Sequence, residues 1–291
     1  MTERAAELSA IVMAAVLSAA FLHALWNSLV KSAGDKFMTS ARVCLWCGFI
    51  AVAVGALTPW PAGAAAPFII ASAIIHVVYF VLVGRLYRNA DLSVVYPLMR
   101  GLAPLIATAV AAAALGERPT PLGLAGVLAL VGGVVTMGAS GFAHGRVDAA
   151  TLRYALVNAA VIAVYSVIDG EGARLSGPTS AHAFAYNAWA DGLTAALYAP
   201  LLVAWRGRGT LREFAQEPGR AAAGGAAAFI GYALVVWAMT RAEIGAVAAL
   251  RECSVVFAAL IGVLALGEPF RRTRGAATLL ILAGVAALKF A

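Results

Sequence analysis

The sequence predicts an all-α integral membrane protein with ten transmembrane helices in two inverted five-helix repeats. Its composition is the first observation behind this prediction: 63% of the 291 residues are hydrophobic and 12% are charged, whereas about 25% are charged in an ordinary soluble domain. The second and third are a series of long apolar segments and an internal duplication. The net charge of +7 does not indicate nucleic-acid binding, because the charges fall mostly between the apolar segments.

The apolar segments are long enough to cross a bilayer, which takes about 20 mostly apolar residues. Ten spans are expected, at residues 8–31, 38–58, 67–88, 92–115, 120–141, 151–173, 181–205, 219–240, 245–267 and 273–290. Glycine, proline and charged residues separate them, as is typical of loops. The first segment is too long for the apolar part of a signal peptide, so we expect a retained helix.

The two halves of the chain repeat each other with a constant offset of 151 residues. The matching residues of the two copies are Arg100 and Arg251, Glu117 and Glu268, and Gly133 and Gly284. The predicted repeats are residues 8–141 and 150–290. Each contains five helices, an odd number, so the second repeat must enter the bilayer from the opposite side.

Basic residues in the loops predict the orientation of the protein. One predicted face collects thirteen Lys and Arg residues and the other collects five. The positive-inside rule places the richer face in the cytoplasm and both termini outside. We therefore expect a multi-pass protein in the lipid bilayer of a bacterial inner membrane. A homodimer is possible, but small-residue patterns are too common in this chain to indicate one.

Several polar residues lie far from the ends of the predicted helices. They are His23, Asn27, His76, Tyr79, Tyr96, Arg100, Tyr165, Asp169, Asn187, Asp191, Tyr232, Arg251 and Glu252. A charge at the bilayer centre costs about 2.5–3.5 kcal/mol on insertion scales, so four such charges facing lipid would cost about 10–14 kcal/mol. The charged members must therefore pair with one another or face a wet cavity, and a substrate path satisfies both conditions.

The inverted repeat places Arg100 and Arg251 at similar depth on opposite sides of the pseudo-axis. Two guanidinium groups facing one cavity favour an anionic or zwitterionic ligand, because their fork of donors suits a carboxylate or phosphonate. Asp169 and Glu252 are candidates to receive an ammonium group or a proton, and His23 is a third proton-coupling candidate. Arg251 and Glu252 are adjacent, hence about 100° apart on a helix, so only one of them can face the cavity.

Structural roles are open alternatives for these residues. Each arginine could hold backbone carbonyls or a carboxylate, and His23 could be a packed core histidine. Glu117 precedes the fifth predicted helix and Glu268 the tenth, where a carboxylate suits the helix dipole. Cys44 and Cys47 form a lone C-x-x-C, for which packing on one helix face is favoured over a metal or redox site. The sequence contains none of the common catalytic or nucleotide-binding motifs, and we predict no cofactor or metal.

The duplicated block resembles the drug/metabolite transporter superfamily, specifically its EamA-type members. The resemblance rests on Ala-Leu-Gly-Glu at 114–117 and again at 265–268, and on ten helices in two halves. More narrowly, residues 23–27, 91–104 and 248–252 resemble a subgroup associated with phosphonate utilisation. The resemblance implies a secondary transporter with a central cavity lined by the first, third, fourth, sixth, eighth and ninth helices.

The predicted function is alternating-access transport of a small polar metabolite, anionic or zwitterionic, such as an amino acid or aminophosphonate. Its expected binding residues are His23, Asn27, His76, Tyr79, Tyr96, Arg100, Asp169, Tyr232, Arg251 and Glu252. Two alternatives remain open. One is a lipid flippase or a membrane-embedded lipid-modifying enzyme, and the other is an exporter of organic cations centred on Asp169 and Glu252.

Overall fold

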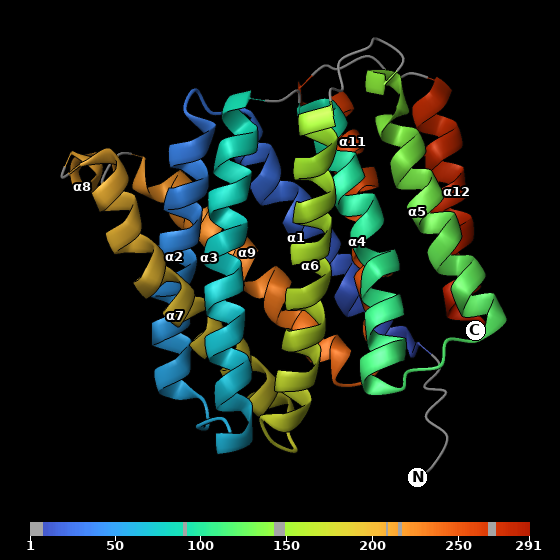
Figure 1. Ribbon diagram of the computed structural model, residues 1–291, viewed down its shortest axis with the longest axis horizontal. Helices are drawn as coiled ribbons and strands as arrows, with labels where there is room; N and C mark the ends of the chain where they lie inside the picture. The colour runs from blue at the N-terminus through green and yellow to red at the C-terminus, as the bar shows by residue number, and fades with distance from the viewer. Residues whose placement is uncertain (1–7, 90–91, 143–148, 208, 215–216, 267–271) are drawn as a thin grey trace.

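The computed structural model describes residues 8–89, 92–142, 149–207, 209–214, 217–266 and 272–291, and every regular element in this part of the chain is helical. The helices stand side by side as one bundle (Figure 1). They are α1 (Ala10–Lys31), α2 (Lys36–Leu57), η1 (Gly63–Ala65), α3 (Ala66–Asn89), α4 (Leu92–Leu115), α5 (Pro121–Phe142), α6 (Ala149–Leu175), α7 (Ser180–Arg206), α8 (Thr210–Phe214), α9 (Pro218–Met239), α10 (Ile244–Arg251), α11 (Ser254–Leu266) and α12 (Arg272–Lys289). The predicted all-α class and its ten spans are confirmed.

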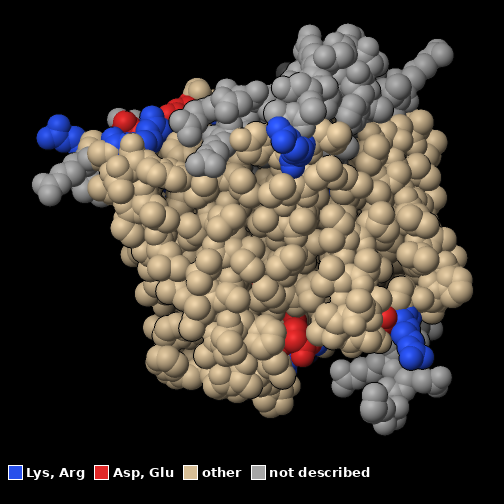
Figure 2. All heavy atoms as spheres, viewed as in Figure 1, with Lys and Arg blue, Asp and Glu red and all other residues tan. Residues whose placement is uncertain are grey.

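The side of the bundle is apolar and its two ends carry the charges. Figure 2 shows a broad band of uncharged atoms, with Lys, Arg, Asp and Glu gathered above and below it. Large apolar side chains such as Ile11, Phe49 and Leu264 are more than half exposed on this side. Six helical stretches of the described chain are long and apolar enough to cross a membrane, and three shorter apolar helices accompany them. This surface is suited to acyl chains rather than to water.

The two halves pack as related units of opposite direction. Helix α1 packs against α9 as α6 packs against α3, and the pairs α2–α7 and α5–α12 each join equivalent helices of the two halves. Figure 1 shows α5 and α12 side by side at one edge of the bundle. These pairings are those that an exchange of the two halves would leave unchanged, as an inverted repeat requires.

The duplicated glycines form the contact between α5 and α12. A Cβ atom at Gly133 would lie 2.9 Å from the carbonyl oxygen of Ala277, and one at Gly284 would lie 2.8 Å from that of Gly126. Positions 126 and 277 are themselves 151 residues apart. The contact at Gly133 and the contact at Gly284 are therefore equivalent when the two copies are exchanged, and in each the lack of a side chain lets the two backbones approach closely.

Three sequence-based expectations need correction. The ninth predicted helix is two helices, α10 and α11, because the amides of Glu252 and Cys253 bond three residues back, to Ala249 and Leu250, and the helical register breaks there. The long loop near residues 206–218 contains the short helix α8. Glu117 does not serve the helix that follows it, since the first turn of α5 is capped by the Thr120 hydroxyl, which accepts from the Gly123 amide at 3.0 Å.

Candidate substrate cavity

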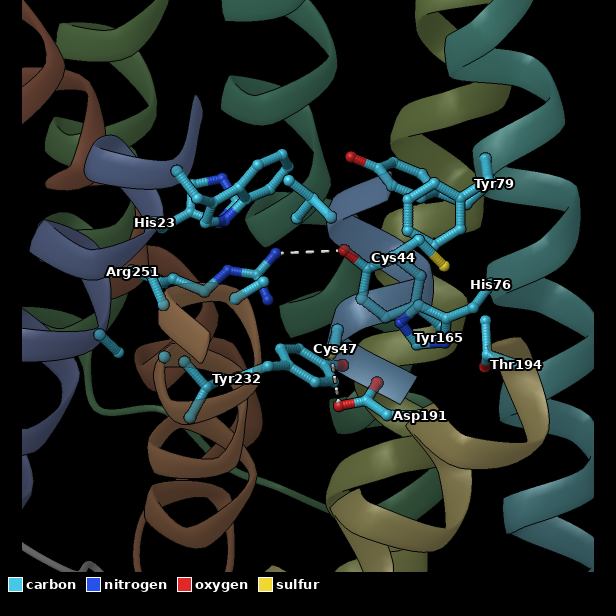
Figure 3. Close-up of a pocket in the computed structure, with 18 of the residues that line it drawn as sticks. His23, Cys44, Cys47, His76, Tyr79, Tyr165, Asp191, Thr194, Tyr232 and Arg251 are labelled. Atoms are coloured by element: carbon cyan, nitrogen blue, oxygen red, sulfur yellow. Dashed lines mark hydrogen bonds between the residues drawn. The ribbon is translucent and has the colours of Figure 1, made fainter. Parts of the chain in front are cut away.

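A central cavity of about 100 Å³ lies between helices of both halves. It is lined from the expected helices α1, α3, α4, α6, α9 and α10, and also from α2 and α7, which the resemblance had not implied. A bound water occupies about 10–15 Å³ on this measure, so the space suits a few waters or a small ligand. Figure 3 shows polar and aromatic side chains from several helices converging on it.

Arg100 and Glu252 form a buried ion pair at the cavity wall. Arg100 Nε donates to Glu252 Oε2 at 3.0 Å, and the second arginine nitrogen lies 2.8 Å from Oε1. The two side chains are 1% and 3% exposed. This parallel arrangement neutralises Arg100, and it occupies the carboxylate that the sequence had offered for an ammonium group or a proton.

Arg251 is the other buried arginine of the site, and its surroundings are different. It is 5% exposed, and its guanidinium donates to the Tyr165 hydroxyl at 3.2 Å (Figure 3). The same group lies 5.6 Å from the centre of the Tyr232 ring. Within the described residues Arg251 has no carboxylate at ion-pair distance, and its Nε has no hydrogen-bond partner. Arg251 is therefore a desolvated cation on the cavity wall, and its Nε–H donor is available to a ligand.

Aromatic rings form the wall beside Arg251. The ring centres of His76 and Tyr165 are 4.3 Å apart, and both rings contact Tyr232. Tyr79 meets Tyr165 edge-on at 5.9 Å. A cavity lined mostly by apolar and aromatic side chains, with a few polar groups, is typical of a small-molecule site.

Asp169 lies behind this aromatic wall rather than in the cavity. It is fully buried, and its two oxygens accept hydrogen bonds from the hydroxyls of Tyr186, at 3.0 Å, and Tyr232. Asp169 is absent from the lining residues. Its carboxylate therefore orients Tyr232 and is not part of the cavity wall.

The cavity contains a carboxylate that the expected site had left out, that of Asp191 on α7. Its Oδ2 accepts from the Asn187 amide at 3.0 Å and from the Cys47 thiol at 3.5 Å. Cys44 also lines the cavity, so the two thiols face the site instead of only packing on a helix face. The i, i+4 pair Asn187 and Asp191 was visible in the sequence, but nothing local showed which way α7 turns it.

The remaining predicted residues divide between the cavity and its surroundings. His23 lines the cavity beside Trp26, with the ring centres 5.1 Å apart, and it is the single proton-coupling candidate found in the wall. Asn27 instead donates to the His23 carbonyl on its own helix at 2.8 Å. The side chain of Tyr96 lies outside the described residues.

Loops and helix ends at one face of the bundle are joined by a group that we call the Glu117 clamp, made of Glu117, Arg174 and the N-terminus of α10. Both Glu117 oxygens accept from the Ile244 amide, at 2.9 and 3.1 Å. Arg174 donates to Glu117 at 2.7 Å and to the carbonyls of Met239 and Ala242. The clamp therefore joins the α4–α5 loop, the end of α6 and the α9–α10 loop.

Comparison with known proteins shows what the chain is similar to. Residues 152–290 match the EamA-like transporter family. This match covers the second copy of the repeat, a little under half of the chain. A solved structure described as a crystal structure of a protein has a TM-score of 0.71 with this chain, at 23% identity, and the match covers 99% of this chain and 98% of that one. No curated protein matches the sequence.

The matched part of the chain is therefore similar to a family of transporters. The match gives no support to the narrower phosphonate-utilisation subgroup. The structural likeness, at 23% identity, supports the fold over nearly the whole chain and assigns no ligand.

Proposed function

We propose that this protein is an EamA-like secondary transporter that moves a small metabolite with a carboxylate or phosphonate group, such as an amino acid or aminophosphonate, by alternating access. Arg251 carries the proposal. It is a buried guanidinium on the wall of a central cavity, and its described partners are a hydroxyl and a ring instead of a carboxylate. Such a group favours an anion that brings the missing charge and acceptors.

The position of the cavity supports transport across the membrane. It lies between the two halves, and its walls come from both of them. The Glu117 clamp holds one face together through loops, which are the parts of a bundle that rearrange most readily. Opening this face while the other closes is the motion that inverted repeats allow.

The alternative functions are less well supported by the same geometry. A lipid substrate would need a larger, laterally open space than a cavity of about 100 Å³. A cation site centred on Asp169 and Glu252 would need those carboxylates in the cavity, but one is bonded to two tyrosines and the other to Arg100. We therefore prefer transport of a compound with an anionic group over transport of a lipid or a cation.

The proposal is tested by the thermal stability of the purified protein in detergent with carboxylates, phosphonates, amino acids and cations. A ligand near 100 times its dissociation constant stabilises by about 2.7 kcal/mol. Compounds with a carboxylate or phosphonate should raise the melting temperature, and Arg251→Gln should abolish the rise. Arg241→Gln is the matched control, since it removes an exposed guanidinium on the α9–α10 loop. Stabilisation by cations alone, or by anions equally in Arg251→Gln, would refute the proposal.

The energy source is a separate question, which transport into vesicles addresses. Proton coupling through His23, the cavity-lining candidate, requires that an imposed pH gradient drive uptake. Uptake that ignores such a gradient would exclude coupling and leave the anion site intact.

A further inference from the structure

Among the residues that the structure describes, the charged side chains that line the cavity are Arg100, Arg251 and Asp191. Arg100 is already neutralised, because Glu252 meets it with both oxygens. One cation and one anion are left, and in the described chain they form no ion pair with each other. The cavity therefore has two separate charged positions of opposite sign.

Both positions have unused hydrogen-bonding capacity. Arg251 Nε has no partner in the described part of the chain. The hydrogen bonds to Asp191 from Asn187 and Cys47 both end on Oδ2, so Oδ1 can accept from a ligand. Figure 3 shows the two side chains entering the cavity from different helices, with the Tyr165 and Tyr232 rings beside them.

We infer that Asp191 binds the ammonium group of a zwitterionic substrate whose carboxylate or phosphonate binds Arg251. The inference rests on the proposed function and narrows its substrate class. A plain anion would satisfy Arg251 and leave the Asp191 carboxylate in a poorly solvated site without a counter-charge, which is costly. A plain amine would satisfy Asp191 and leave the Arg251 guanidinium without a counter-charge. A zwitterion neutralises both groups at once.

The neighbours of Asp191 fit this role. Asn187 and Cys47 are neutral donors, so they orient the carboxylate and leave its charge uncompensated. Thr194 also lines the cavity from α7, one turn further along the helix. The rings of His76, Tyr165 and Tyr232 lie across the cavity and offer faces to an ammonium group or an apolar side chain.

The test compares compounds that share one carbon skeleton. The first set is leucine, 4-methylpentanoate and 3-methylbutylamine, and the second is 2-aminoethylphosphonate, ethylphosphonate and ethylamine. Their binding to the full chain in detergent is measured by thermal shift and by calorimetry. We expect the zwitterion of at least one set to bind about tenfold to hundredfold more tightly than either partner, because each charge-assisted contact contributes that much.

Asp191→Asn should remove this preference, so that the zwitterion and the plain anion bind alike, whereas Asp191→Glu should retain part of it. Asp35→Asn is the matched control, because Asp35 is an exposed carboxylate outside the cavity that pairs with Arg206. A melting temperature for each variant without ligand separates loss of binding from loss of folding. Equal binding of anion and zwitterion by the native protein would overturn the inference and leave the proposed function standing. Binding of neither would overturn the proposed function as well.

Discussion

Glu252, on the second repeat, is the ion-pair partner of Arg100 on the first, with contacts of 2.8 and 3.0 Å. The position equivalent to Glu252 in the first repeat, 151 residues earlier, is Gly101. The first repeat therefore offers Arg251 no glutamate equivalent to the one that the second repeat offers Arg100. The duplicated arginines have unequal roles for this reason: Arg100 is neutralised within the protein, whereas Arg251 has no carboxylate partner among the described residues and is the group that we propose binds the ligand.

Removing one member of this pair should destabilise the protein strongly. Arg100→Gln or Glu252→Gln leaves an uncompensated buried charge, which costs about 3–5 kcal/mol. The double variant should recover part of the loss, because neither charge then remains. Chemical unfolding in detergent measures this. The exposed pair of Arg206 and Asp35 is the control, with about 0–1 kcal/mol expected for either single change. Equal losses of stability for the buried and the exposed pair would contradict the conclusion that Arg100 and Glu252 neutralise each other in the folded protein.

Breaking the Glu117 clamp should open the face that it holds. Glu117→Ala removes the acceptor of the Ile244 amide and of Arg174. Cys44 and Cys47, which line the cavity, should then react faster with a membrane-impermeant maleimide added from that face. Glu213→Ala, on the short helix α8, provides the control. Unchanged labelling from both faces would show that the clamp does not control access.

The contact between α5 and α12 should not tolerate a side chain at the duplicated glycine. A Cβ at Gly284 would lie 2.8 Å from the Gly126 carbonyl oxygen and 2.9 Å from the Leu130 amide nitrogen, both backbone atoms that cannot move aside alone. Gly284→Ala should cost about 1–3 kcal/mol, the usual range for overpacking. Gly63→Ala, where nothing lies within 4 Å, should change the free energy of unfolding little. An unchanged free energy of unfolding in Gly284→Ala would argue against this packing of α5 on α12.

The carboxyl group of Glu243, beside the clamp, should make stability depend on pH. Burial, and then the nearby Glu117 carboxylate, raise the pKa of Glu243 above its usual value. A raised pKa in the folded state means that its stabilising contribution is complete in acid and is lost as the pH rises through the folded pKa. Glu243→Gln should therefore raise the melting temperature at neutral pH and change it little in acid. Melting curves across pH test this, and a variant that lowers the melting temperature at neutral pH would contradict it.

The sequence alone determined the helices and their inverted relationship, whereas most of the helices that line the cavity were implied by the resemblance to a known family. These features depend on local or additive properties: about 20 apolar residues cross a bilayer, and an odd number of helices reverses the second repeat. It also indicated that either Arg251 or Glu252 would face the cavity, since neighbours on a helix point in different directions.

The tertiary structure alone decided which charges meet. Arg100 and Glu252 are 152 residues apart, and Glu117 bonds to an amide 127 residues away. The inclusion of Asp191 in the cavity and the exclusion of Asp169 from it depend on how α7 and α6 are rotated against their neighbours. In a chain so uniformly apolar the hydrophobic pattern hardly distinguishes one helix face from another, so helix rotation is set by packing between helices, which no local stretch of sequence contains.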